Sequence, residues 1–352
     1  MIKIDSQSVT TPRGVVTLYT LTNSSGASVE LQSIGAGIRS VNVPDRDGVI
    51  ADVAIGYADV AAYFADGPCA GKTPGRYANR IGEGKFSIHG KQYQLRINNG
   101  PNALHGGPEG FANKIWQSCI NGESAVFSLF SPDGDENYPG NLLVSVIYTW
   151  SEDNTLSVEY HAVTDAPTVI NLTNHAYFNL RGEGAGADAL KAHTMQVFAS
   201  HYLPTNDSLV PTGVIATVNG TPMDFTEPKA IGADLYADFP AIEIGKGYDA
   251  CWVIDDWKND GVMRKAVELT DTVSGRKLIV STTQPAVQIY TGNWLEGAPK
   301  SVSGEQYHDY DAVAIECQGM PDAPNKPNFP SQFLFPGDIY NQKIKFKFSN
   351  ID

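Results

Sequence analysis

Short runs in which apolar and polar residues alternate recur along nearly the whole chain. In residues 156–161, Leu, Val and Tyr alternate with Ser, Glu and His. Successive side chains of a β-strand point to opposite faces, so this alternation predicts strands with one buried face. Convincing amphipathic helices are scarce, and only residues 58–64 could form a couple of helical turns. Many short strands without intervening helices favour an all-β sandwich or barrel over βαβ units.

The other strand candidates are separated by turn signals such as Asp133-Gly134 and Pro336-Gly337. Apolar residues at positions 86–88 and 93–97 flank a short segment that contains Gly90, which predicts a hairpin. The remaining predicted strands are residues 15–21, 144–150, 277–283, 287–290, 313–316 and 344–348.

The length of 352 residues suggests about two domains at roughly 150 residues each, although large all-β domains often exceed that average. No Ser/Gly-rich or charged linker divides the chain, and no internal repeat of fixed period is present. We therefore expect a single domain over residues 1–352. The longest irregular stretch, residues 319–333, contains four prolines, and loops of that length tend to be functional when they are ordered.

Net charge argues against polyanionic partners. The chain has 25 Lys and Arg against 39 Asp and Glu, which gives a formal net charge of −14 and disfavours nucleic-acid binding. Basic blocks that would suit an anionic membrane are missing, and no apolar run approaches the roughly 18 residues of a transmembrane helix. The first residues lack a signal-peptide core. We expect a cytoplasmic protein that is a monomer or a homodimer and binds neither nucleic acid nor membrane.

The cysteines and the common enzyme motifs give only negative information. Cys69, Cys119, Cys251 and Cys317 lie far apart and form no CxxC pair, which is typical of neither a disulfide framework nor a zinc site. We expect them to be small buried apolar residues. The motifs GxGxxG after a strand, GxxxxGK[ST], HExxH and GxSxG are all absent, so the usual signals of four large enzyme classes are missing.

Two histidines lie in segments rich in polar residues. In residues 98–107, two glycines follow His105 and would let the backbone approach a ligand closely, although a surface-loop histidine is an equal alternative. In residues 170–180, alternation would place one polar row on a single face if the segment is extended. That row suits the floor of a polar cleft; the alternative is a solvated outer face. It consists of Asn171, Thr173, His175, Tyr177 and Asn179.

A carboxylate interrupts the apolar run at residues 313–320. Strand alternation places Glu316 and Gln318 on one face, with Val313 and Ile315 on the other. An unpaired buried charge is costly, so this glutamate needs a reason. Burial also raises the pKa of a carboxyl group, which suits a general base that works near neutrality. The alternative is a strand glutamate paired with an Arg or Lys of a neighbouring strand.

Further charged residues could bind a ligand or a carboxylate. Asp249 precedes an apolar run, and a lone Asp in that place is usually a cap or a turn residue. Arg76, Asn79 and Arg80 lie within one seven-residue segment. Either arginine could form a bidentate contact with a ligand oxygen or with a carboxylate such as Glu316 or Asp249.

Taken together, these segments resemble the aldose 1-epimerases, also called galactose mutarotases. The similar blocks occur in the family's order and extend from residue 75 to residue 330. They are GRYANRI (75–81), NNGPNALHGG (98–107), TNHAYFNL (173–180), GYD (247–249), QIYTGNWL (288–295) and AIECQ…PDAPN…FP (314–330). The resemblance implies a large antiparallel β-sandwich of the galactose-mutarotase type with its site in an open cleft.

The resemblance also implies roles for residues at an aldose. Glu316 would be the base at the C1 hydroxyl, His175 the acid at the ring oxygen, and His105 would support charge there. An unperturbed imidazole pKa of about 6.5 suits that acid role. No cofactor and no metal are implied. The residues implied to bind sugar hydroxyls are Asp249, Arg80, Asn79 and, through this match only, Gln288.

This chain departs from the family's usual pattern in two places. Ala250-Cys251-Trp252 follows Asp249, where family members often carry His or Asn, and Gly319-Met320 replaces a bulkier pair. Both differences leave the implied acid and base intact and bear on the sugar preference.

Three other functions fit some of the same residues. A glycosidase would use Asp249 and Glu316 as its carboxylate pair, which leaves the histidines without a role. A non-catalytic sugar-binding protein of the same fold would not need an acid–base pair. A metal site could use His105, His175 and Glu316, but the chain lacks closely spaced histidines.

Overall fold

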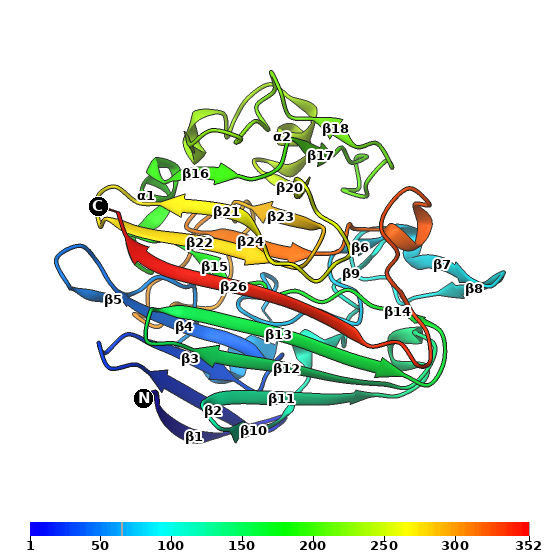
Figure 1. Ribbon diagram of the computed structural model, residues 1–352, viewed down its shortest axis with the longest axis horizontal. Coiled ribbons are helices and arrows are strands. Elements are labelled where there is room, and N and C mark those ends of the chain that lie inside the picture. Colours follow the sequence, from blue (N-terminus) through cyan, green and yellow to red (C-terminus); the bar gives the residue numbers. More distant parts are fainter. Residues whose placement is uncertain (65, 352) are drawn as a thin grey trace.

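Two layers of antiparallel strands form the structure, which is a computed structural model that describes residues 1–64 and 66–351. The front layer in Figure 1 is a nine-stranded sheet, and strands such as β23 and β24 lie behind it. In sheet order the front strands are β10 (Gln117–Asn121), β11 (Ser124–Ser131), β12 (Leu142–Trp150), β13 (Thr155–Thr164), β26 (Tyr340–Asn350), β22 (Arg276–Thr282), β21 (Arg264–Thr270), β16 (Thr194–Val197) and β19 (Lys229–Ala230).

The second layer consists of a six-stranded sheet and a five-stranded sheet. The six-stranded sheet contains, in order, β15 (Tyr177–Phe178), β24 (Val313–Gln318), β23 (Ala286–Tyr290), β20 (Asp249–Val253), β17 (His201–Leu203) and β18 (Ala216–Thr217). The five-stranded sheet contains β1 (Lys3–Thr11), β2 (Gly14–Thr22), β3 (Ser28–Gln32), β4 (Gly37–Pro44) and β5 (Ile50–Asp52).

Short elements connect the layers. Three two-stranded ribbons are β6 (Arg80–Ile81) with β9 (Ala103–Leu104), β7 (Lys85–Ile88) with β8 (Lys91–Gln94), and β14 (Thr168–Val169) with β25 (Phe333–Leu334). The α-helices are α1 (Gly186–Ala192) and α2 (Pro240–Gly245). The 3-10 turns are η1 (Val60–Phe64), η2 (Gly82–Gly84), η3 (Phe111–Asn113), η4 (Asp135–Asn137), η5 (Ile231–Ala233) and η6 (Ala323–Asn325). None of the helices in the described part of the chain is long and apolar enough to cross a membrane.

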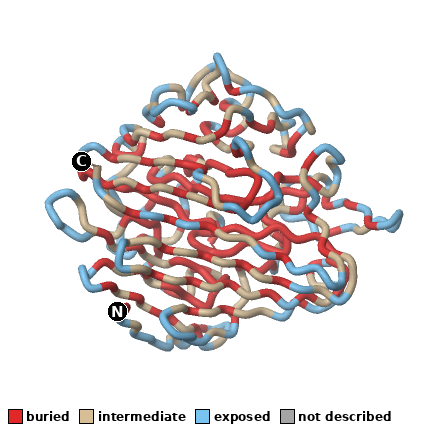
Figure 2. Tube along the Cα trace, in the orientation of Figure 1, coloured by how far each residue is buried: buried red, intermediate tan, exposed pale blue. Residues whose placement is uncertain are grey.

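Alternating side chains from both layers meet in one hydrophobic core. On β24, Val313 and Ile315 face this core, whereas Glu316 faces away from it. Across the layers, the rings of Phe178 on β15 and Phe346 on β26 have centroids 5.5 Å apart. Buried residues accordingly follow the central strands of the molecule (Figure 2). The period-two pattern of the sequence therefore corresponds to the inner and outer faces of a sandwich.

The predicted strands and the hairpin are confirmed, and the short η1 fits the couple of helical turns expected at residues 58–64. The helices α1 and α2 were missed because such short segments are too brief to show a 3.6-residue period. The expectation that all four cysteines are buried was wrong for one of them. Cys69, Cys251 and Cys317 are buried, but Cys119 is exposed. It lies on the edge strand β10, whose exposed face does not require an apolar partner.

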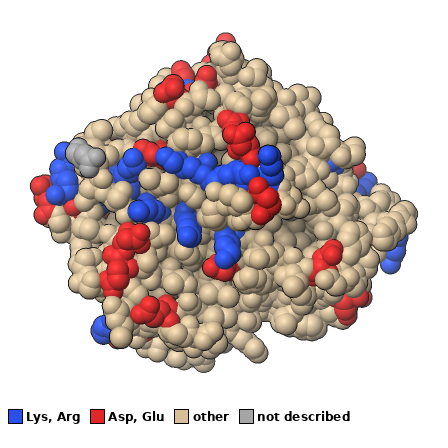
Figure 3. Space-filling model, viewed as in Figure 1, with Lys and Arg blue, Asp and Glu red and all other residues tan. Residues whose placement is uncertain are grey.

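The outer face of the nine-stranded sheet is charged. Figure 3 shows Lys and Arg gathered in a strip across this face. The burial patterns of β22 and β26 place Lys277, Lys343 and Lys347 at outward-facing positions. These three ammonium groups pair with carboxylates at 2.5, 3.0 and 3.5 Å. Such exposed pairs stabilise a protein little, so the strip is best understood as the solvated side of the sheet.

Replacing Phe346 with Ala should reveal how much the contact between the layers contributes. Phe346 is fully buried, so Phe346→Ala should lower the free energy of unfolding by about 3–5 kcal/mol. Urea denaturation followed by tryptophan fluorescence measures this change. Lys345→Ala, on the exposed face of the same strand, is the control and should change stability by less than about 0.5 kcal/mol. Equal effects of the two substitutions would contradict the assignment of inner and outer faces.

Candidate active site

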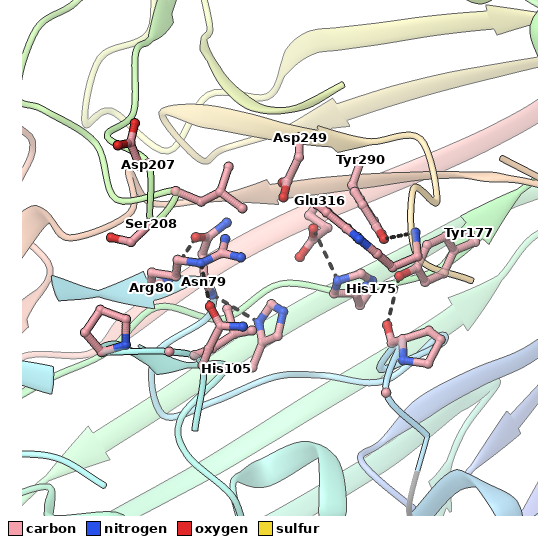
Figure 4. A pocket seen from close by; sticks show the side chains of 18 residues that line it. Asn79, Arg80, His105, His175, Tyr177, Asp207, Ser208, Asp249, Tyr290 and Glu316 are labelled. Carbon is pink, nitrogen blue, oxygen red and sulfur yellow. Dashed lines mark hydrogen bonds and ion pairs between the residues drawn. The ribbon is translucent and has the colours of Figure 1, made fainter. Parts of the chain in front are cut away.

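A cleft of about 610 Å³ opens on the face of the six-stranded sheet that points away from the core. Its floor comes from strands of this sheet, and its walls come from β6, β9 and nearby loops. Figure 4 shows Glu316 and His175 pointing toward each other, with Arg80, Asn79 and His105 grouped at one side. The charged, aromatic and imidazole side chains that line the cleft are Arg80, His105, His175, Tyr177, Asp207, Asp249, Tyr290, Trp294 and Glu316.

The strand register brings the floor residues together from distant parts of the chain. Gln288 of β23 lies opposite Glu316 of β24, and Tyr290 lies opposite Asp249 of β20. Alternate residues of a strand share a face, so these four side chains occupy two neighbouring rows on one face of the sheet. The predicted face of Glu316 is therefore the face that bears the cleft.

The predicted polar row at residues 171–179 does not form the cleft floor. His175 and Tyr177 line the cleft, but Asn171, Thr173 and Asn179 are buried elsewhere and bind backbone groups or have no hydrogen-bond partner among the described residues. Residues 170–176 are not a strand of either layer, so strict alternation does not apply to them. The alternative of a solvated face is wrong too, because the whole row is buried.

Side chains of β26, of the loop between β22 and β23 and of the segment itself hold the backbone around His175. The Leu172 N–H donates to the Tyr340 hydroxyl at 3.1 Å, and the Gln284 amide donates to the Leu172 carbonyl at 3.2 Å. The Asn174 side chain accepts from the backbone of Ala176 at 3.0 Å. The His175 backbone itself bonds to the neighbouring segment, since its N–H donates to the Lys72 carbonyl and its carbonyl accepts from the Gly71 N–H, each at 2.9 Å. His175 is thereby fixed in place without belonging to a strand.

The central feature of the cleft is the pair formed by Glu316 and His175. His175 Nε2 lies 3.4 Å from Glu316 Oε1, and both side chains are almost fully buried. Burial raises the pKa of Glu316 well above its usual value, and the neighbouring Asp249 adds to the increase. Burial also lowers the pKa of His175 to about 4. The pair therefore shares one proton over a wide pH range, with burial favouring the neutral carboxyl and the neutral imidazole.

His105 is held as a hydrogen-bond donor toward the cleft. The backbone N–H of Asn79 donates to His105 Nδ1 at 3.1 Å. Burial lowers the pKa of His105 well below its usual value, so the ring is neutral near pH 7. A neutral imidazole that accepts at Nδ1 carries its proton on Nε2. The β6–β9 ribbon places Asn79 beside His105, because it pairs Arg80 with Leu104.

Of the remaining residues that the sequence suggested for sugar binding, some line the cleft and one does not. Arg80 and Asp249 line the cleft, and Arg80 Nε donates to Asn99 at 3.0 Å. Gln288 lies outside the lining, where its amide donates to Asp249 Oδ1 at 2.6 Å. Burial raises the pKa of Asp249, whereas the charge of Arg80 and the hydrogen bond from Gln288 oppose the increase.

Arg76 is not at the cleft, so the expectation that it could bind a ligand or a cleft carboxylate was wrong. Its guanidinium is buried and donates to the backbone carbonyls of Ser131, Pro132 and Pro139 and to the hydroxyl of Thr168. Burial lowers its pKa to about 10. Arg76 therefore joins loops behind the site, where its five donors satisfy backbone groups.

Several lining residues were missed from the sequence. Tyr290 and Trp294 lie in a segment that was singled out only for Gln288, and their stacked rings form part of one wall. Asp207, Ser208 and Leu209 form another part of the rim, and nothing in their local pattern distinguishes them from an ordinary turn. Within residues 1–64 and 66–351, no three or more His, Cys, Asp or Glu side chains are arranged to hold a metal ion.

A buried carboxyl–imidazole pair in an open polar cleft on an antiparallel β-sandwich is typical of an acid–base enzyme that acts on a small hydroxylated molecule. The aldose 1-epimerase family model matches residues 17–347. The chain belongs to the aldose 1-epimerase family.

Individual relatives cover nearly the whole chain. Galactose mutarotase of Rattus norvegicus is 41% identical over 322 residues, which are 92% of this chain and 91% of the rat protein. Aldose 1-epimerase of Escherichia coli K12 is 37% identical over 334 residues, 94% of each chain. Among solved structures, the GalM/aldose epimerase homologue from C. elegans has a TM-score of 0.86 at 31% identity, covering 99% of this chain and 100% of that one. Galactose 1-epimerase from Lactobacillus acidophilus NCFM has a TM-score of 0.85 at 27% identity, covering 100% of both.

Substitution of Arg76 should lower the free energy of unfolding more than substitution of Arg80. Arg76→Met leaves several buried carbonyls without donors and should lower the free energy of unfolding by about 3 kcal/mol or more. Arg80→Met removes one hydrogen bond at the cleft and should change stability by about 1 kcal/mol. Urea denaturation of both variants measures the difference. A stable Arg76→Met protein would contradict the structural role of this residue.

Proposed function

We propose that the protein is an aldose 1-epimerase that interconverts the α and β anomers of free aldohexoses of the glucose and galactose type. The observation that carries this proposal is the 3.4 Å contact between the Glu316 carboxyl and the His175 imidazole inside the cleft. Family membership and the names of the relatives support it, since two of them are called galactose mutarotase and aldose 1-epimerase.

Anomer exchange requires proton transfer at two oxygens bonded to the same carbon. Glu316, as a carboxylate, takes the proton of the C1 hydroxyl, while His175, as an imidazolium, protonates the ring oxygen. The bond between C1 and the ring oxygen breaks, and an open-chain aldehyde forms. After rotation about the C1–C2 bond, the C5 hydroxyl attacks the other face of the aldehyde and both proton transfers reverse. Because the C1 hydroxyl and the ring oxygen are close together, a base and an acid in contact can serve both.

The pair holds one proton in its resting state. Burial favours the form in which Glu316 is protonated and His175 is neutral. Transfer of that proton across the 3.4 Å contact generates the carboxylate and the imidazolium that begin ring opening. Ring opening returns the pair to its neutral form, so no external proton is consumed. The positive charge of Arg80 favours the carboxylate and therefore assists the first transfer.

Neighbouring residues bind and orient the sugar in this proposal. His105 donates its Nε2 proton on the ring-oxygen side, which supports the charge that develops there. Asp249, Arg80 and Asn79 bind sugar hydroxyls at the cleft. Gln288 acts through Asp249, whose carboxylate it holds at 2.6 Å, instead of contacting the sugar directly.

We also propose a single domain over residues 1–352, located in the cytoplasm as a monomer or homodimer. One continuous core joins β1–β4 with β11–β13, β20–β24 and β26, which supports a single unit. All four cysteines are free, which suits a reducing compartment. A single urea transition seen by two probes, cell fractionation and sedimentation velocity test these three points in turn.

Polarimetry on freshly dissolved α-D-glucose and α-D-galactose tests the activity. Glu316→Gln and His175→Asn should each lower the enzymatic rate by roughly 10²–10⁴-fold, because each removes one of the two proton-transfer groups. Circular dichroism confirms that the variants are folded. A variant with near-wild-type turnover would overturn the role of that residue. Binding of galactose without any change in the decay of optical rotation would indicate a sugar-binding protein, and release of nitrophenol from nitrophenyl glycosides would indicate a glycosidase.

The pH profile of kcat/KM should lack the inflection near pH 6.5 that a histidine with an ordinary pKa gives. Below pH 4, the imidazole of His175 becomes protonated while the Glu316 carboxyl keeps its own proton. The pair then contains no base, and activity falls. Activity also falls at high pH, where Glu316 loses its proton from a raised pKa. We expect kcat/KM to be flat from about pH 5 through neutrality. Stopped-flow polarimetry, corrected for the spontaneous reaction, measures the profile. An acidic inflection near 6.5 would contradict the buried pair.

A further inference from the structure

Polar atoms without partners accumulate behind Glu316. Both amide atoms of Gln318 and the hydroxyl of Thr173 are buried without a hydrogen-bond partner among the described residues, and so is Glu316 Oε2. Gln318 and Thr173 are fully buried, with 0% of each exposed. Neither residue lines the cleft. Unpaired polar atoms in such a place require an explanation.

The backbone places these groups next to one another. Gln318 follows Glu316 by two residues on β24, so the two side chains share a face and their Cβ atoms lie about 7 Å apart. The neighbouring segment runs alongside: His175 contacts Glu316, and Asn171 binds the backbone of Gly319 at 2.7 Å. Thr173, halfway between Asn171 and His175, therefore lies beside Gln318.

Across from Gln318 on the neighbouring strand, the described residues place an apolar side chain and not a hydrogen-bond partner. The residue opposite Gln318 is Ala286 of β23, which belongs with Met320 to an apolar cluster. A buried amide that faces only apolar groups is destabilising, whereas a water that binds about three polar groups removes that cost. The Gln318 amide, the Thr173 hydroxyl and Glu316 Oε2 provide three such groups.

We propose that Gln318 and Thr173 hold a buried water molecule against Glu316 Oε2, on the side of the carboxyl group away from the sugar. The water accepts from Gln318 and Thr173 and donates to Glu316. A donor on the carboxylate favours the ionised form, so this water opposes the effect of burial and prepares Glu316 to act as a base. Gln318 is thus a positioning residue. This inference rests on the proposed function for its kinetic consequences but not for the water itself.

Other charged or titratable groups around Glu316 set the background for its titration. They are His175 just before β15, Tyr177 on β15, Asp249 and Cys251 on β20, Arg80 on β6, Cys317 on β24, and Cys69. None of them is altered by substitutions at Gln318 or Thr173, so a change in the alkaline limb of the pH profile reports on the proposed water.

Gln318→Met keeps the size of the side chain and removes both hydrogen-bonding atoms. We expect kcat to fall about tenfold with KM within about twofold, and the alkaline limb of the pH profile to rise by about one pH unit. Thr173→Val should act in the same direction, and Thr173→Ser, which keeps the hydroxyl, should recover the profile. The double variant Gln318→Met/Thr173→Val should be little worse than Gln318→Met alone, because both act through one water.

Gln32→Met is the matched control. Gln32 on β3 is also fully buried with both amide atoms unpaired among the described residues, but it does not line the cleft or lie on β24. This variant should leave the pH profile unchanged. An equal shift in the control, or no shift in Gln318→Met, would overturn the inference.

A crystal structure of the wild-type protein tests the water independently of activity. We expect an ordered water within hydrogen-bond distance of Gln318, Thr173 and Glu316 Oε2, and its absence from Gln318→Met. A dry site, or a Gln318 amide bonded only to other groups, would overturn the inference. If the wild-type protein has no epimerase activity but contains this water, the proposed function fails and the water site stands.

Discussion

The contact between the Glu316 carboxyl and the His175 imidazole is the interaction on which the site depends. The two groups are almost fully buried and lie 3.4 Å apart. Burial disfavours the charged form of each, so the pair retains one proton that can move between them. An isolated carboxylate or imidazole at this depth would lack the partner that makes reversible transfer possible. The charge of Arg80 adjusts this balance, and in the proposed mechanism the remaining cleft residues orient the sugar.

The sandwich is what allows such a pair to exist. One face of the six-stranded sheet packs on the nine-stranded sheet, which leaves the other face free for a cleft. The His175 backbone bonds to the backbone of residues 71 and 72, and nearby Leu172 is held by Tyr340 and Gln284. Those two residues are far from His175 in sequence. Support from distant parts of the chain therefore positions the His175 imidazole on irregular backbone, which explains why a large fold surrounds a small site.

The sequence predicted more of the fold than of the site. Strand alternation correctly predicted β12, β22, β24 and the hairpin of β7 and β8, because a half-buried strand has a period that local sequence records. The same rule failed at residues 170–176, where the chain is buried on all sides and side-chain amides bind backbone. Arg76 and Arg80 could not be told apart, since both look equally able to bind an anion. Gln288 was included only by resemblance, and it lies behind Asp249 instead of in the lining.

The sequence by itself determined that the chain forms antiparallel strands and that Glu316 lies on the face opposite the core, since alternation within a strand is a local property. It also contained enough similar blocks to indicate the family. Only the tertiary structure decided which distant side chains meet. The register that pairs β23 with β24 joins residues 24 to 32 positions apart, and the irregular segment brings His175 to Glu316, which lies 141 positions away in the sequence. The pKa values of the pair follow from that burial, and no local pattern contains it.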